Sequence, residues 1–181
     1  MQQGILQSNG RDMLMKQWDT KLQETLDPPG LCNLVEKECQ REIRLSCRKI
    51  ADYFSQESNK VTPEPVYELV QLLFAKLQDE VEHLFLKETG IIFPAIKNAG
   101  PGYVIPQKIP ENIHQTQQVI INLLLKLRQQ LNNYVVQPGW CKEWRACVNE
   151  LFLLEREIHQ WIYIEQSLLY PSISSKPQSA E

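Results

Sequence analysis

Apolar side chains recur along this chain at intervals of three, four and seven residues, the spacing of one face of an α-helix. Four long stretches show this pattern, at about 31–56, 64–94, 110–134 and 140–170, and a shorter one lies at 12–26. Strict alternation of apolar and polar residues, which marks β-strands, is nearly absent. The pattern therefore predicts four long amphipathic helices preceded by a short lead-in helix.

Proline and glycine separate these stretches. The breaks are Pro28-Pro29-Gly30, the loop at 98–108 and Gln137-Pro138-Gly139, while Thr62-Pro63-Glu64 has the residues of a helix start. Short connections between long helices predict an all-α fold, an antiparallel up-down-up-down four-helix bundle. We expect residues 1–28 to form the lead-in segment, 29–171 the bundle and 172–181 a disordered tail.

Composition narrows the class of protein. With 181 residues, 43% hydrophobic content and a net charge of −3, the chain predicts one domain with a substantial core. There is no basic stripe for nucleic acid, no apolar run long enough for a membrane and no signal-peptide pattern, so we expect a cytoplasmic protein. None of the five cysteines forms a Cys-x-x-Cys pair, which fits a reducing compartment; their role stays open.

One motif occurs twice, 77 positions apart. Residues 88–96 and 165–173 each read glutamate, two small or polar residues, two branched aliphatics, an aromatic residue, proline, a small residue and isoleucine. Glu88 and Glu165 both lie on the apolar stripe of their helix, where an ionised carboxylate is costly unless it is paired or bound to metal. Two interpretations stay open at this point. Each glutamate lies at the open end of the bundle, solvated or hydrogen-bonded to Lys, Arg or His, or the carboxylates project into the core, as in di-iron bundles.

Three segments resemble hemerythrin-like proteins, and among these the di-iron proteins that repair damaged iron–sulfur clusters. They are residues 86–100 (LKETGIIFPAIKNAG), 138–146 (PGWCKEWRA) and 155–171 (EREIHQWIYIEQSLLYP), and the likeness covers roughly 30–173. The resemblance implies a hemerythrin-like bundle, non-haem iron, and a role in iron–sulfur repair and in the response to nitric-oxide stress.

The ligand set that the resemblance implies is only partly present. The family has a histidine four residues before each glutamate and one histidine on each of the other two helices. Leu84 and Trp161 stand at the first two of these positions, His114 falls near the third-helix position, and Cys39 or Glu38 replaces the first-helix histidine. The candidate metal ligands are therefore Glu88, His114, Glu165, Cys39 and Glu38.

Two further histidines do not complete this set. His83 lies five residues before Glu88, and His159 lies six residues before Glu165. At about 100° per residue both point away from the glutamate face of their helix, so we place them outside direct contact with a metal.

These substitutions favour a divergent member of the family whose di-iron site is lost or remodelled, acting in regulation or protein binding rather than as an enzyme, and without a cofactor. In that case Glu88, His114 and Glu165 would form a buried cluster that shares a proton. The alternative is a non-haem iron protein with a reduced ligand set that donates iron or binds nitric oxide or dioxygen. A third hypothesis, a helical adaptor unrelated to metals, would be favoured by solvent-exposed Glu88 and Glu165. The expected partner is an unidentified protein, and a homodimer stays open.

Overall fold

The computed structural model describes residues 26–56, 66–100 and 102–174, and the regular elements within these ranges are all helical. The long helices are α3 (Gln40–Ser55), α4 (Tyr67–Lys87), α6 (Lys108–Gln130) and α7 (Lys142–Ile164). The short ones are α2 (Pro28–Leu34), α5 (Phe93–Lys97) and α8 (Tyr170–Ile173), a 3₁₀ turn η4 (Asn132–Tyr134), and three π-helical turns, η1 (Val35–Cys39), η3 (Glu88–Ile92) and η5 (Glu165–Leu169).

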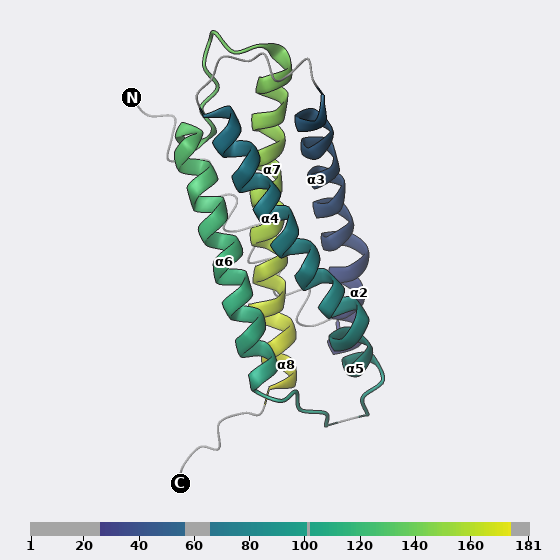
Figure 1. Cartoon of the computed structure of the whole chain (residues 1–181). Helices are drawn as coiled ribbons and strands as arrows, with labels where there is room; N and C mark the ends of the chain where they lie inside the picture. The colour runs from purple at the N-terminus through teal and green to yellow at the C-terminus, as the bar shows by residue number, and fades with distance from the viewer. Residues whose placement is uncertain (1–25, 57–65, 101, 175–181) are drawn as a thin grey trace, which may run out of the picture.

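These elements join into four rods that run alternately up and down (Figure 1). Each rod but the third contains a π-helical turn, so that α2, η1 and α3 form the first rod and α7, η5 and α8 the fourth. The first rod packs mainly on the fourth and the second mainly on the third. The predicted antiparallel four-helix bundle is confirmed.

The first rod begins as its sequence predicts. The Asp27 carboxylate accepts a hydrogen bond of 2.9 Å from the backbone N–H of Gly30, and the two prolines between them occupy positions where a helix has no partner for an N–H. A Cβ atom on residue 30 would lie 2.9 Å from the Asp27 carboxylate oxygen. Glycine therefore allows this close cap.

The duplicated motif explains two of the π-helical turns. Glu88 begins η3 and Glu165 begins η5, and the prolines of the motif follow directly, in α5 and α8. A proline donates no hydrogen bond, and in a regular helix its ring clashes with the carbonyl four residues earlier. The wide turn before each proline changes the hydrogen-bond register locally. The same residues thus give the second and fourth rods the same ending; η1 has no such proline.

The described boundaries lie close to those expected. Of the predicted lead-in helix at 12–26 only Leu26 is described, and the predicted start at Thr62 lies outside the described residues. Helix α8 continues to Ile173, which is buried and accepts a 2.9 Å hydrogen bond from the N–H of Ile105, so the ordered chain reaches past the expected boundary at 171. None of the helices in these ranges is long and apolar enough to cross a membrane.

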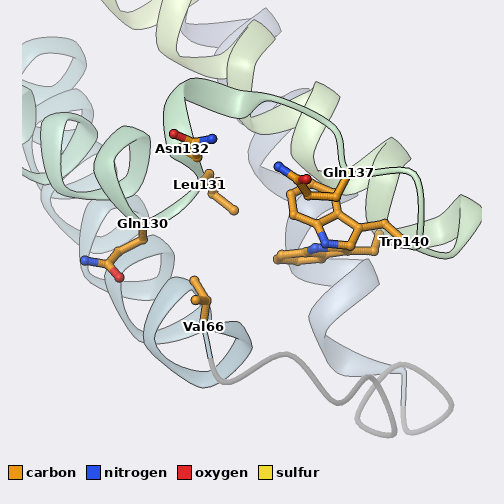
Figure 2. A pocket seen from close by; sticks show the side chains of 8 residues that line it. Val66, Gln130, Leu131, Asn132, Gln137 and Trp140 are labelled. Carbon is orange, nitrogen blue, oxygen red and sulfur yellow. The ribbon is translucent and has the colours of Figure 1, made fainter.

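A cavity of about 300 Å³ opens at the end of the bundle where α6 turns into α7 (Figure 2). Trp140 and Trp144 form part of its wall, with ring centroids 5.8 Å apart. The remaining lining residues are Val66, Gln130, Leu131, Asn132, Gln137 and Gly139. The duplicated glutamates lie at the opposite end of the bundle, so the cavity and the glutamates are separate features.

Candidate functional site

Glu88 and Glu165 meet in the core. Each has no exposed surface, and the two side chains are close enough for each to influence the protonation of the other. They come together because each begins the π-helical turn of its rod, at the same level of the bundle. The interpretation that places them in solvent at an open end is wrong, and the exposure that would have favoured the adaptor hypothesis is not found.

Each carboxylate also accepts a hydrogen bond from a buried glutamine. The Gln40 Nε2 atom lies 2.9 Å from Glu88 Oε2, and the Gln117 Nε2 atom lies 2.7 Å from Glu165 Oε2. Gln40, on α3, and Gln117, on α6, are both fully buried. The four rods of the bundle therefore each contribute one polar side chain to a single buried group.

A third glutamine extends this group towards the surface. Gln166, which is partly buried, donates from Nε2 to Gln117 Oε1 at 2.6 Å. We call the five side chains Glu88, Glu165, Gln40, Gln117 and Gln166 the carboxylate–amide cluster.

Burial favours the protonated form of both carboxyl groups. Burial, and then the charge of Glu165, raise the pKa of Glu88 well above its ordinary value. Burial raises the pKa of Glu165 to about 8, although the nearby Trp161 indole, Glu88 and the hydrogen bond from Gln117 favour its charged form. The two carboxyls therefore titrate as a coupled pair in which burial favours the protonated form.

Several buried polar atoms around the pair have no hydrogen-bond partner among the described residues. They are Oε1 of Glu88, Oε1 of Glu165, Oε1 of Gln40, the Tyr170 hydroxyl and Nε1 of Trp161. The Trp161 indole lies near enough to Glu165 to favour its charged form, but its N–H makes no well-aligned bond. Burial and both carboxylates raise the pKa of Tyr170, which keeps that hydroxyl neutral beside them.

Of the candidate ligands, the structure places His114 and Glu38 away from the two glutamates and Cys39 beside them. His114 is exposed, and Gln117, three residues further along α6, reaches Glu165 in its place. Glu38 is exposed and pairs with Arg41 at 3.4 Å, while Gln40 is the first-rod residue that reaches Glu88. Cys39 is partly buried; burial, followed by the charge of Glu165, raises its pKa to about 12, so it is a neutral thiol beside the cluster. The predicted cluster of Glu88, His114 and Glu165 thus contains a glutamine where histidine was expected.

The other two histidines face solvent. The His83 Nδ1 atom lies 2.9 Å from the carbonyl oxygen of Asp79, and His159 Nε2 lies 3.6 Å from the buried carboxylate of Glu155. Both side chains are exposed, as expected from their helical phase. Neither contacts the carboxylate–amide cluster.

Leu84 and Trp161 fill the space beside the carboxylates. Leu84 is 1% exposed and Trp161 is 0% exposed. The Trp161 ring packs edge-on against Phe85, with the ring centroids 4.8 Å apart. Each lies four residues, about one helical turn, before a glutamate. Large apolar groups thus occupy the two positions nearest the carboxylates on their own helices.

The residues present do not fit the di-iron centre that the resemblance implies. That centre requires four histidines, and the corresponding positions hold Gln40, Leu84, Gln117 and Trp161. In the part of the chain that the structure describes, no three His, Cys, Asp or Glu side chains are grouped closely enough to hold a metal ion. The two amides direct N–H groups at the carboxylates, and N–H groups cannot act as metal ligands.

The sequence contains a signal for the two glutamines, although the motif alone does not mark them. Gln40 and Gln117 are 77 positions apart, the same separation as Glu88 and Glu165, and each glutamine–glutamate hydrogen bond spans 48 positions. Extending the duplication from the conspicuous motif to the other pair of helices would have aligned Gln40 with Gln117. The sequence predicts His114 instead, because the resemblance implies an imidazole ligand on the third helix.

Comparison with known proteins gives one relative for this all-α bundle. The chain is 24% identical over 157 residues to the iron-sulfur cluster repair protein ScdA of Staphylococcus haemolyticus (strain JCSC1435). The match covers 82% of this chain and 68% of that protein. No family model matches the chain. The similarity is distant and supports a relationship to the iron–sulfur cluster repair proteins at most.

Proposed function

We propose that this protein is a divergent hemerythrin-like relative of the iron–sulfur cluster repair proteins that works without a di-iron centre, as a regulatory or protein-binding bundle. The observation that carries the proposal is the set Gln40, Leu84, Gln117 and Trp161, which leaves the two carboxylates without any imidazole. The distant similarity to ScdA and the all-α bundle support the family part of the proposal.

The retained carboxylates are consistent with this role. Two uncapped carboxylates in an apolar core would be strongly destabilising, whereas amide donors and a shared proton satisfy them without metal. The bundle can therefore keep its inherited fold and present its surface to a partner.

Metal content tests the proposal directly. The full chain is expressed in iron-supplemented cells, purified without oxygen or chelator, and analysed by mass spectrometry for iron, manganese and zinc. We expect well below one metal ion per chain and no change in Glu88→Gln/Glu165→Gln. Stoichiometric iron that is lost in this double variant would overturn the proposal.

Such a result would favour the second candidate, a non-haem iron protein with a reduced ligand set that donates iron or binds nitric oxide or dioxygen. The observation in its favour is that Glu88 and Glu165 still meet in the core, each with an oxygen that has no partner among the described residues. An optical spectrum that changes on addition of nitric oxide to the iron-loaded protein would support it.

A further inference from the structure

A carboxamide has two chemically opposite ends, and the end that faces a carboxylate determines whether a cation can bind there. The oxygen accepts hydrogen bonds and can ligate a hard metal ion, whereas the NH₂ group only donates. In the carboxylate–amide cluster both buried glutamines direct Nε2 at a carboxylate. Each amide therefore places a donor where a cation would otherwise neutralise the charge.

Gln166 fixes the orientation of one of these amides. Its Nε2 donates to Gln117 Oε1 at 2.6 Å on the side away from Glu165, so both ends of the Gln117 amide are engaged while its NH₂ faces that carboxylate. Turning the Gln117 amide over would break both hydrogen bonds and place Gln117 Oε1 against Glu165 Oε2.

Gln166 lies next to Glu165 in the chain, inside the same π-helical turn, yet it is only partly buried. In a regular helix, adjacent side chains point about 100° apart. The turn therefore places Glu165 in the core and directs Gln166 towards α6, where it reaches Gln117.

We propose that Gln166 is a positioning residue that holds the Gln117 amide with its N–H groups towards Glu165 and thereby closes the carboxylate pair to divalent cations. The inference rests on the proposed function, since it explains how a bundle that kept both carboxylates stays free of metal. Gln40 likewise directs its NH₂ group at a carboxylate, that of Glu88. No described side chain holds the other end of its amide, because Gln40 Oε1 has no partner among the described residues.

The test replaces Gln166 by an isosteric residue that accepts a hydrogen bond from Gln117 instead of donating one. In Gln166→Glu the new carboxylate can only accept, so the Gln117 amide turns over, donates to residue 166 and directs Oε1 towards Glu165. Glu88, Glu165 and Gln117 then offer converging oxygens, a donor set that suits Mn²⁺. Gln160→Glu is the matched control, because Gln160 is an exposed residue on α7 and receives the same change in charge.

Binding of Mn²⁺ to each full-length protein is titrated by electron paramagnetic resonance, with circular dichroism as a check of folding. Mutation of a group that is hydrogen-bonded to a metal ligand changes metal affinity by about 10–100-fold. We therefore expect Gln166→Glu to bind Mn²⁺ at least about 10-fold more tightly than the wild type or Gln160→Glu. A folded Gln166→Glu protein whose affinity equals that of Gln160→Glu would overturn the inference.

If Gln166→Glu does not fold, Gln166→Met is measured instead. It removes the donor without adding charge and frees the Gln117 amide to turn. We expect tighter Mn²⁺ binding than in wild type, and equal binding would overturn the inference. Failure of the proposed function looks different, since stoichiometric metal would then be present in the wild-type protein as purified.

Discussion

At the scale of single residues, the chemistry of this protein depends on amides that replace imidazoles. A histidine can ligate a metal through one nitrogen and satisfy a second partner through the other, whereas a glutamine facing a carboxylate can only donate. Gln40 and Gln117 therefore suit a carboxylate pair that is neutralised by a proton.

The cap on Glu165 should contribute measurably to stability. Gln117→Leu keeps the size of the side chain but leaves a fully buried carboxyl without its 2.7 Å donor. We expect the free energy of unfolding to fall by about 1–3 kcal/mol, the cost of a buried polar group that loses its partner. Denaturant unfolding measures it, and Gln118→Leu, at an exposed site on the same helix, should change stability by less than about 0.5 kcal/mol.

The raised pKa values predict a pH dependence of stability. Burial raises the pKa of Glu165 from 4.5 to about 8 and that of Glu88 in the same direction, so the folded protein keeps protons that the unfolded chain releases above pH 4.5. The stabilisation is therefore complete below about pH 4.5 and is lost as the pH rises towards 8. The slope is about 1.4 kcal/mol per pH unit for each proton held.

Unfolding free energies measured from pH 5 to 8 test this dependence. Glu88→Gln/Glu165→Gln should flatten the curve, and Glu143→Gln, at an exposed position, should keep the wild-type slope. Glu157, whose pKa burial also raises, adds a smaller slope common to all three proteins. A double variant with the wild-type slope would show that the pair holds no extra proton.

At the scale of elements, the bundle has two specialised ends. At one end, π-helical turns followed by proline place the carboxylates. At the other, the turn between α6 and α7 contains three consecutive non-glycine residues with positive φ, namely 47° at Asn132, 58° at Asn133 and 62° at Tyr134. A left-handed conformation is costly for a bulky side chain and persists only where its surroundings hold it.

Glu155 holds this turn. It is 3% exposed, accepts a hydrogen bond from the Tyr134 hydroxyl at 2.5 Å and pairs with Arg128. We expect Glu155→Ala to cost about 3 kcal/mol, because it leaves the Tyr134 hydroxyl and part of Arg128 without a partner. Thermal and denaturant unfolding measure the loss, with Glu143→Ala on the same helix as the exposed control. A loss no larger than in the control would mean that the turn does not depend on this contact.

At the scale of the whole molecule, stability comes from the apolar stripes that meet along the bundle axis. Helix α4 offers a matched pair, since Leu77 is 0% exposed and Leu72 is 68% exposed. We expect Leu77→Ala to lower the free energy of unfolding by about 2–5 kcal/mol, whereas Leu72→Ala should change it by less than about 0.5 kcal/mol. Equal effects in denaturant unfolding would contradict the arrangement of the bundle.

The sequence determined the fold class because helical periodicity, prolines and caps are local properties. The stripes along 31–56, 64–94, 110–134 and 140–170 allow no other efficient burial than four packed helices, and the duplicated motif marked Glu88 and Glu165 as the unusual core residues. Proline six positions after each glutamate also fixed where the second and fourth rods change their hydrogen-bond register.

Only the tertiary structure decided which side chains surround the carboxylates. Position 40 rather than 38 or 39, and position 117 rather than 114, reach the glutamates. That choice depends on how neighbouring rods rotate and slide against each other, and a shift of one residue turns a helix by about 100°. Local pattern specifies the face that a helix buries, but the depth and partner of one polar side chain on that face follow from packing between helices distant in sequence. For this reason the sequence predicted a bundle with two buried glutamates, and the structure was needed to show that amides complete the cluster.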